Sequence, residues 1–363
     1  MSLPNTGEVQ TSIGSLTVRR VQENQTEAAV RLLRDAAGWM QTTGLTQWNP
    51  EQFTDGEVRR YFTEREVYMA FKDDIPAAVF TLQFGDPQYW GSRSDDRYAY
   101  LHRLAVALPF RGSGIGGELL KYAAVNAKSC GHRGLRLDTI EYNVKLNRYY
   151  QTQGFRYMGT NDAGGGRLVN LYEKIEDDGD DKAIRLQYFD ESDFSVIAGW
   201  SPSPESLKQW AGPSLQFPLR HEELAEYIRE ANRPAVSKLL AYSAVHSASG
   251  DTVGHISLAN IDRDNGHGRI GRVVLAPGCR GQGYGRSMMA EAMRIGFEGL
   301  KLHRLSLGVF DFNAPALSLY ESLGFRREGE QVEAARFGDR YVNLIDMAML
   351  DREWKDIRSS VLK

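Results

Sequence analysis

The sequence predicts two consecutive α/β domains, each a β-sheet flanked by helices, because one signature occurs twice with similar surroundings. Arg111-Gly-Ser-Gly-Ile-Gly116 returns 169 residues later as Arg280-Gly-Gln-Gly-Tyr-Gly285. A second pattern follows each copy: an asparagine, a tyrosine seven residues on, and a Gly-Phe pair four residues further, at Asn143, Tyr150 and Gly154 and again at Asn313, Tyr320 and Gly324. Such a repeat indicates a duplicated domain, and 363 residues suffice for two full cores.

The elements of each domain follow in the same order. First strands are predicted at residues 16–21 and 183–188, and helical regions follow both. Apolar stretches predict further strands at 67–71 and 77–82 in the first half, and at 239–243 and 252–258 in the second. The strands at 102–106 and 272–275 run into the glycine loops, and apolar residues at helical spacing follow each loop. Each unit therefore contains a strand, a glycine loop, a helix, a strand and a helix.

The boundary between the domains is predicted at Glu176-Asp-Asp-Gly-Asp-Asp-Lys182. This acidic stretch contains a glycine and no apolar residue, so it cannot contribute to a hydrophobic core. The expected domains are residues 1–175 and 183–363, with residues 176–182 as the linker.

Composition argues against several kinds of partner. A formal charge of −3 without a long Lys/Arg block disfavours nucleic acid. No apolar run approaches the roughly 20 residues of a membrane span, and the first residues show no signal-peptide pattern, so no membrane contact is expected. Cys130 and Cys279 fall at different places in the two repeats, which favours a reducing cytoplasm. No His, Cys or carboxylate residues show metal-ligand spacing, so no metal is expected.

The glycine loops have the character of anion sites. A strand that ends in a glycine loop and opens a helix presents unpaired N–H groups at the positive end of the helix dipole, which favours a pyrophosphate. Gly117-Glu118 and Arg286-Ser287 follow the last glycines, so the Lys-Ser/Thr ending of a nucleoside-triphosphate loop is missing. The loops also lie too deep within each half for a dinucleotide-binding fold, which has its loop after the first strand.

Both halves resemble the GNAT family of N-acetyltransferases, whose acetyl-CoA loop reads Arg/Gln-x-x-Gly-x-Gly/Ala. The resemblance implies two tandem GNAT domains, each a mixed, mostly antiparallel sheet with splayed fourth and fifth strands. Pantetheine of acetyl-CoA would lie along Leu104 and Val106, and along Val273 and Leu275. The pyrophosphate would meet the glycine loops at Arg111, Gly112, Gly114, Gly116 and Gly117, and at Arg280, Gly281, Gly283, Tyr284, Gly285 and Arg286. The second half also resembles the branch of ribosomal-protein N-terminal acetyltransferases, and the first a small-amine branch.

The same resemblance suggests catalytic residues. Tyr150 and Tyr320 occupy the family's position for the acid that protonates the leaving thiolate; core aromatics are the alternative. Asn143 and Asn313 are expected to contact the cofactor or to cap a helix. No strand-four carboxylate is present to act as the base. His102 and His267 could relay a proton, although a histidine in a strand is often only hydrogen bonded, and water remains an alternative.

The expected reaction is direct transfer of acetyl to the primary amine of a small or peptide-like cationic molecule, which includes antibiotics. Protein N-terminal acetylation and an acetyl-CoA sensor are the alternatives. The tryptophans of both halves could form aromatic walls or pack helices, and loop carboxylates such as Asp86 and Asp262 could attract a polyamine or be solvated. Catalysis is expected in the second half, and the protein as a monomer or homodimer.

Overall fold

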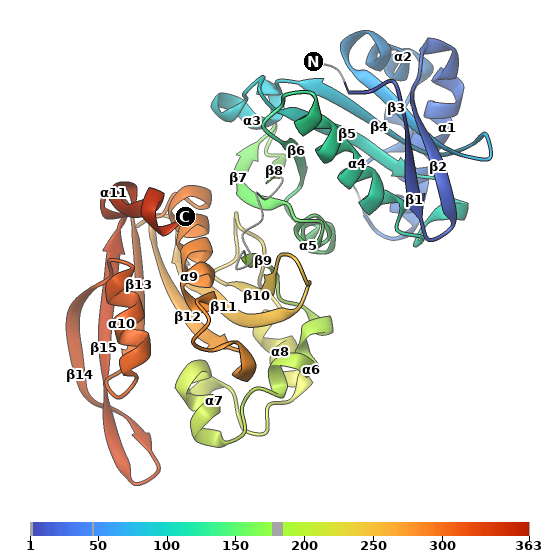
Figure 1. Ribbon diagram of the computed structural model, residues 1–363. Coiled ribbons are helices and arrows are strands. Elements are labelled where there is room, and N and C mark those ends of the chain that lie inside the picture. Colours follow the sequence, from blue (N-terminus) through green and yellow to red (C-terminus); the bar gives the residue numbers. More distant parts are fainter. Residues whose placement is uncertain (1–2, 46, 176–183, 363) are drawn as a thin grey trace. The chain divides into compact units, whose positions relative to one another are not determined.

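The computed structural model describes residues 3–45, 47–175 and 184–362 (Figure 1). The chain divides into two compact units. The first comprises Met1–Phe155 and Asn161–Asp178, and the second comprises Arg156–Thr160 and Gly179–Lys363. The predicted linker, 176–182, lies outside the described residues.

The first sheet has eight strands in the order β1-β2-β3-β4-β5-β6-β8-β7. Strand pairs with a described register run antiparallel except β5–β6, which is parallel because helix α4 crosses between the two strands. The strands are β1 (Thr6–Thr11), β2 (Gly14–Arg20), β3 (Glu66–Lys72), β4 (Ile75–Phe84), β5 (Ala99–Val106), β6 (Leu135–Ile140), β7 (Arg156–Asp162) and β8 (Leu168–Lys174).

The first strand of the domain was wrongly assigned. The segment predicted as the first strand is β2, and β1 precedes it in a hairpin whose turn is at residues 12–13, just before Gly14, where φ is 100°. A polar edge strand lacks the apolar run that identified the others. The remaining strand predictions of this half are confirmed as β3, β4 and β5.

The helices of the first unit are α1 (Thr26–Thr42), α2 (Asp55–Glu64), α3 (Pro87–Trp90), α4 (Ile115–Ser129) and α5 (Val144–Thr152). Helix α1 is amphipathic, and its buried face forms one core with α2 and β3. The core includes Leu33, Phe53, Met69 and Ala105 of β5. Helix α4 buries the residues whose spacing predicted it, Leu119, Leu120, Ala123, Ala124 and Ala127.

The second sheet has seven strands in the order β14-β15-β13-β12-β11-β10-β9, and only β12–β13 is parallel among its described pairs. The strands are β9 (Ile184–Tyr188), β10 (Leu240–His246), β11 (Thr252–Asp262), β12 (His267–Leu275), β13 (Arg304–Phe310), β14 (Arg326–Phe337) and β15 (Arg340–Leu350). The helices are α6 (Phe194–Ala198), α7 (Pro204–Ala211), α8 (His221–Ile228), α9 (Tyr284–Arg294), α10 (Ala314–Ser322) and α11 (Asp351–Val361). The core under α6–α8 contains Val274 of β12.

The strand that precedes each glycine loop separates from its parallel neighbour. Strands β5 and β6 pair only at Ala99–Leu135 and Tyr100–Arg136, and β12–β13 pairing ends at Arg269–Ser306. Within the described strands, the remainder of β5 and β12 has no partner on that side. This confirms the expected splay in both domains and leaves backbone groups free to bind a ligand.

Candidate functional site

Both glycine loops have the same backbone conformation. The φ angles are 76° and 80° at Gly112 and Gly114, and 74° and 95° at Gly281 and Gly283. Gly114 and Gly283 are the residues that directly precede α4 and α9. Glycine is required here because other L-residues rarely adopt a positive φ. A Cβ atom on Gly112, Gly114 or Gly281 would meet no atom within 4 Å, so there is room for an anion beside the helix N–H groups.

The next glycines of the first loop allow close packing against α5. A Cβ on Gly116 would lie 2.9 Å from the Tyr149 hydroxyl, and one on Gly117 would lie 2.5 Å from Oε1 of Gln153. In the second loop, a Cβ on Gly285 would lie 3.4 Å from Leu319. The later glycines therefore bring the two helices together, whereas the earlier ones leave space.

Arg111 lies over the end of β5. Its guanidinium stacks 4.0 Å from the centre of the Trp39 ring, and its Nε donates a hydrogen bond to the Val106 carbonyl at 3.3 Å. Burial lowers the pKa of Arg111, and its buried Nη1 has no hydrogen-bond partner among the described residues. Arg280, its counterpart, is exposed and lines a cavity.

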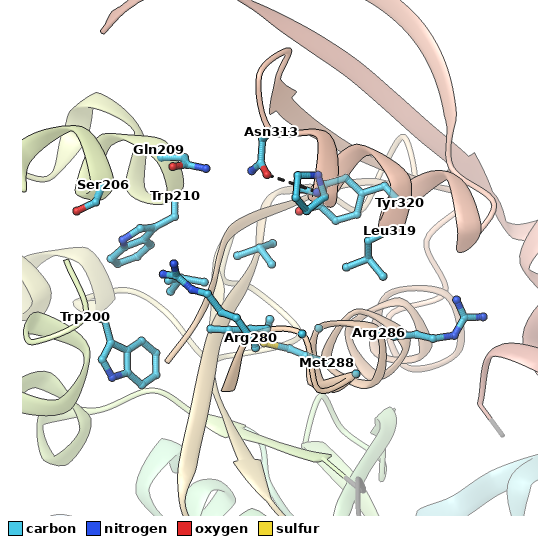
Figure 2. Close-up of a pocket in the computed structure, with 18 residues that line it drawn as sticks. Trp200, Ser206, Gln209, Trp210, Arg280, Arg286, Met288, Asn313, Leu319 and Tyr320 are labelled. Atoms are coloured by element: carbon cyan, nitrogen blue, oxygen red, sulfur yellow. Dashed lines mark hydrogen bonds between the residues drawn. The ribbon is translucent and has the colours of Figure 1, made fainter. Parts of the chain in front are cut away.

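That cavity, in the second domain, has a volume of about 570 Å³ (Figure 2). It combines the end of β12, the glycine loop, the start of α9, one face of α10 and the Trp200–α7 segment. Figure 2 shows Trp200 and Trp210 on one side and Leu319 and Tyr320 on the other. The predicted cofactor residues that line it are Val273, Leu275, Arg280, Gly281, Gly283, Gly285, Arg286 and Asn313, and the lining also contains Val274, Ser206, Gln209, Met288, Pro315 and Ala316.

The predicted catalytic tyrosines are packed alike. Tyr320 contacts Phe325 edge to face at 6.3 Å between ring centres, and Tyr150 contacts Phe155 in the same way at 6.0 Å. Burial raises the pKa of Tyr320 to about 12, and burial, with smaller contributions from Tyr149 and Asp138, raises the pKa of Tyr150. Both phenols are therefore neutral hydrogen-bond donors near neutral pH.

The two asparagines cap helices. Asn143 accepts a hydrogen bond from the Leu146 N–H at 3.1 Å, and Asn313 accepts one from the Ala316 N–H at 3.4 Å (Figure 2). Each side chain thus satisfies a free N–H at the start of α5 or α10. Asn313 also lines the cavity, so capping and contact with a ligand are compatible at this position.

Two tryptophans of the second domain lie at the cavity. Trp200, 8% exposed, and the partly buried Trp210 pack in the core of the second domain, and both line the cavity. The Trp210 Nε1 donates a hydrogen bond to Ser201 Oγ at 2.9 Å, which fixes the ring. The lining includes Arg280 and Arg286, and among the described residues that form it there is no carboxylate and no histidine.

The side chains of two predicted residues do not reach this cavity, although the contact predicted for one of them, Tyr284, is its backbone N–H. His267 is exposed at the start of β12, six residues before Val273, or about 20 Å at the usual strand rise. Its place is too remote for proton transfer in the cavity. Tyr284 begins α9, but its ring packs against His246 at 5.7 Å and is not part of the lining.

In the first domain, His102 lies between two carboxylates. Its Nε2 is 3.1 Å from Asp86 Oδ2, and its Nδ1 is 3.5 Å from Asp138 Oδ1. Burial raises the pKa of the Asp138 carboxyl, an effect that His102 opposes. Both ring nitrogens therefore lie beside carboxylates. Sequence reasoning missed Asp138; its only signal is an acid within the apolar strand 135–140.

Comparison with known proteins decides the family. The sequence profile described as "Acetyltransferase (GNAT) family" matches the chain twice, at residues 31–155 and 205–325. The chain belongs to the GNAT family. The two matches coincide with the two repeats, and the splayed strands and glycine loops are present in both.

Several relatives that match parts of the chain are named as N-acetyltransferases. The uncharacterized N-acetyltransferase YesJ of Bacillus subtilis is 29% identical over 154 residues, 41% of this chain and 83% of that protein. The L-amino acid N-acetyltransferase AaaT of Escherichia coli is 29% identical over 166 residues, 46% of this chain and 96% of that protein. The spermidine N(1)-acetyltransferase of Vibrio cholerae is 29% identical over 110 residues, 30% of this chain and 63% of that protein.

A solved structure of the Vibrio cholerae spermidine N-acetyltransferase in complex with CoA and spermine is 22% identical, with a TM-score of 0.42, and the match covers 47% of this chain and 98% of that one.

The family and the relatives identify the chain as an acetyl-CoA-dependent N-acetyltransferase. Among the described helices, none is long and apolar enough to span a bilayer.

Proposed function

We propose that the cavity of the second domain binds acetyl-CoA and transfers its acetyl group to a small primary amine. One observation carries the proposal: a single cavity of about 570 Å³ is lined by the splayed strand, the glycine loop, Tyr320 and the aromatic pair Trp200 and Trp210. The splayed strand, the glycine loop and Tyr320 provide the contacts for acetyl-CoA. The aromatic pair provides a wall for the acceptor amine.

The proposed placement of acetyl-CoA follows the free backbone groups. Pantetheine lies along Val273 and Leu275, whose edge of β12 lacks a β13 partner. The pyrophosphate meets the N–H groups of residues 281–285, and Arg280 and Arg286 offer positive charge through their side chains, since the Arg286 N–H donates to the Gly283 carbonyl at 3.0 Å. The equivalent groups of the first domain are Leu104, Val106 and the loop from Gly112 to Gly117, with Asn143 and Tyr150 at α5.

The proposed chemistry is direct attack by the neutral amine. Val273 follows the positive-φ residue Arg272, and neither residue has a partner in the described β11 register, so the Val273 N–H is available to stabilise the oxyanion. Tyr320 faces the departing sulfur. With a pKa of about 12 against about 8.5 for an ordinary thiol, complete proton transfer from Tyr320 costs roughly 5 kcal/mol. Tyr320 therefore acts mainly as a hydrogen-bond donor to the thiolate.

The lining suggests the acceptor class. The faces of Trp200 and Trp210 suit a single cationic or neutral amine, while Ser206 and Gln209 offer hydrogen bonds. Without a lining carboxylate, a polyamine would leave its second ammonium group unpaired. The amine proton leaves through water, because no histidine or acid lines the cavity. Amino-acid amides, monoamines and cationic antibiotics with an apolar body fit these features.

The test is release of free CoA thiol by the full chain. The panel contains an aromatic monoamine, an L-amino acid amide, spermidine, an aminoglycoside and short peptides with free N-termini. Turnover of the monoamine or amide supports the proposal. Selective acetylation of peptide N-termini would contradict the proposal and favour protein modification, the activity of the N-terminal acetyltransferase branch that the second half resembles. Binding of acetyl-CoA without turnover of any amine would favour a sensor.

A further inference from the structure

The side chains of Asp86, His102 and Asp138 meet in the first domain where β5 and β6 separate. Tyr100 and Arg136 are the last paired residues, and Arg136 Nη1 donates a hydrogen bond to the Tyr100 hydroxyl at 2.9 Å. Side chains two residues apart lie on the same face of a strand, so the next pair on this face is His102 and Asp138. Asp86, just after β4, reaches the same point.

These side chains are buried and incompletely bonded. The side chains of Asp86, His102 and Asp138 are 2%, 7% and 11% exposed. Asp86 Oδ2, His102 Nε2 and Asp138 Oδ1 each have no hydrogen-bond partner among the described residues. Although Nε2 and Oδ2 are only 3.1 Å apart, they are not aligned as donor and acceptor. Buried polar atoms of this kind usually have a partner, so three unpaired atoms within one cluster indicate a ligand.

The charge of the cluster has the sign that favours a cation. Among the described ion pairs, His102 is the sole partner of both Asp86 and Asp138. Arg103 and Arg167 act on Asp138, and the partly buried Arg65 acts on Asp86, only from a distance. Even a doubly protonated imidazole would neutralise one of the two carboxylates. Buried charges are costly unless they are paired or coordinate a metal.

We propose that Asp86, His102 and Asp138 form a binding site for one divalent transition-metal ion. One ligand atom from each residue lies within 4.8 Å of the other two. Ligands about 2.0–2.1 Å from a tetrahedral ion are about 3.3 Å apart, close to the 3.1 Å between Nε2 and Oδ2. Imidazole with two carboxylates suits Zn²⁺ or Mn²⁺. The ion ties β5, β6 and the segment after β4 together where the sheet opens.

Residues 184–362 of the second domain hold no equivalent cluster. Counting from the last paired residues, Arg269 and Ser306, the positions of His102 and Asp138 are occupied by Gly271 and Gly308. The guanidinium of Arg269 fills the space beside Gly308 and pairs with Asp346 at 3.3 Å. The stoichiometry expected for the full chain is therefore one ion, not two.

The experiment titrates chelator-treated full chain with MnCl₂, following the loss of the free Mn²⁺ signal by electron paramagnetic resonance, and repeats the titration with ZnCl₂ by calorimetry. We expect one saturable site, weakened at least tenfold in Asp138→Asn and in His102→Gln. The control is His303→Gln, which breaks an exposed His–Asp pair of 3.0 Å and should leave binding unchanged. Circular dichroism establishes that each variant is folded.

Two results would overturn the proposal. One is the lack of a saturable site for either ion in the wild-type chain, with ¹⁵N NMR showing protons on both His102 nitrogens. The other is full binding in both folded cluster variants. The titration requires no turnover, so its failure leaves the proposed acetyl transfer in the second domain untouched, and the failure of acetyl transfer leaves the metal site untouched.

Discussion

Arg103 and Arg272 have the same left-handed backbone conformation at the same place in the two domains, eight residues before Arg111 and Arg280. Their φ angles are 55° and 48°, and the register of the neighbouring antiparallel strand shifts beside each. This repeated bulge leaves Leu104 and Val273 without a partner in the described register of β4 and β11. The two domains therefore share the cofactor half of the site and differ immediately before the bulge, at His102 and Gly271.

Replacing Gly283 by alanine tests the glycine loop. A φ of 95° is strained for alanine by roughly 1–2 kcal/mol, so the loop should relax and present fewer N–H groups to the pyrophosphate. We expect acetyl-CoA affinity, measured by calorimetry, to fall about tenfold or more. Gly278→Ala is the matched control, because Gly278 has no positive φ and open space around it. Equal affinities for the two variants would contradict a role for the loop.

Much of the cofactor half was predictable because it depends on local backbone chemistry. Glycines that need positive φ, the strand before them and the helix after them are contiguous in sequence, so the loops at 111–116 and 280–285 were recognisable. A site that depends on contacts between distant segments was not predictable in the same way. Asp86, His102 and Asp138 come from three separate segments, and no spacing rule joins them. Likewise, the exposed position of His267 follows from where β12 begins, which its sequence does not specify.

Trp210→Ala tests the acceptor wall. Loss of the indole should raise the KM for the amine about tenfold or more, since aromatic contacts with a partly desolvated cation contribute about 1–2 kcal/mol. The KM for acetyl-CoA should change by less than about twofold. Tyr341→Ala removes an exposed aromatic of the same domain outside the cavity and should alter neither KM. A parallel rise in both KM values would indicate general damage to the domain.

His255 should make the second domain acid-sensitive. Burial, with a smaller effect of Arg272, lowers the pKa of His255 to about 3, against about 6.5 in the unfolded chain. Its contribution to stability is complete above pH 6.5 and is lost as the pH falls from 6.5 towards 3. The free energy of unfolding of the second domain should therefore fall by about 2 kcal/mol between pH 6.5 and 5.

Urea unfolding at pH 7.5, 6 and 5 measures this effect. In His255→Gln, the change in unfolding free energy with pH should be smaller by about 2 kcal/mol. His267→Gln, at an exposed site, should leave that change as it is in the wild type. An unchanged dependence in His255→Gln would show that His255 does not remain neutral in the folded state.

The pH–rate profile should lack an alkaline decline due to Tyr320. Because the pKa of Tyr320 is about 12, its hydroxyl keeps its proton up to about pH 11. The acceptor amine, with a pKa of about 10.4, becomes more reactive as it loses its proton. We therefore expect kcat/KM for the amine to rise from pH 7 to 10 and then level off. A decline between pH 8 and 10 would place a catalytic acid with a lower pKa in the site.

The most direct measurement is thiol release by Tyr320→Phe beside its first-domain counterpart Tyr150→Phe, at saturating acetyl-CoA and with the best amine of the panel. Loss of the hydroxyl that stabilises the leaving thiolate should lower kcat roughly 10²-fold in Tyr320→Phe. Acetyl-CoA affinity should stay the same, and Tyr150→Phe should retain the wild-type rate. Full activity in Tyr320→Phe, or its loss in Tyr150→Phe alone, would contradict catalysis in the second-domain cavity.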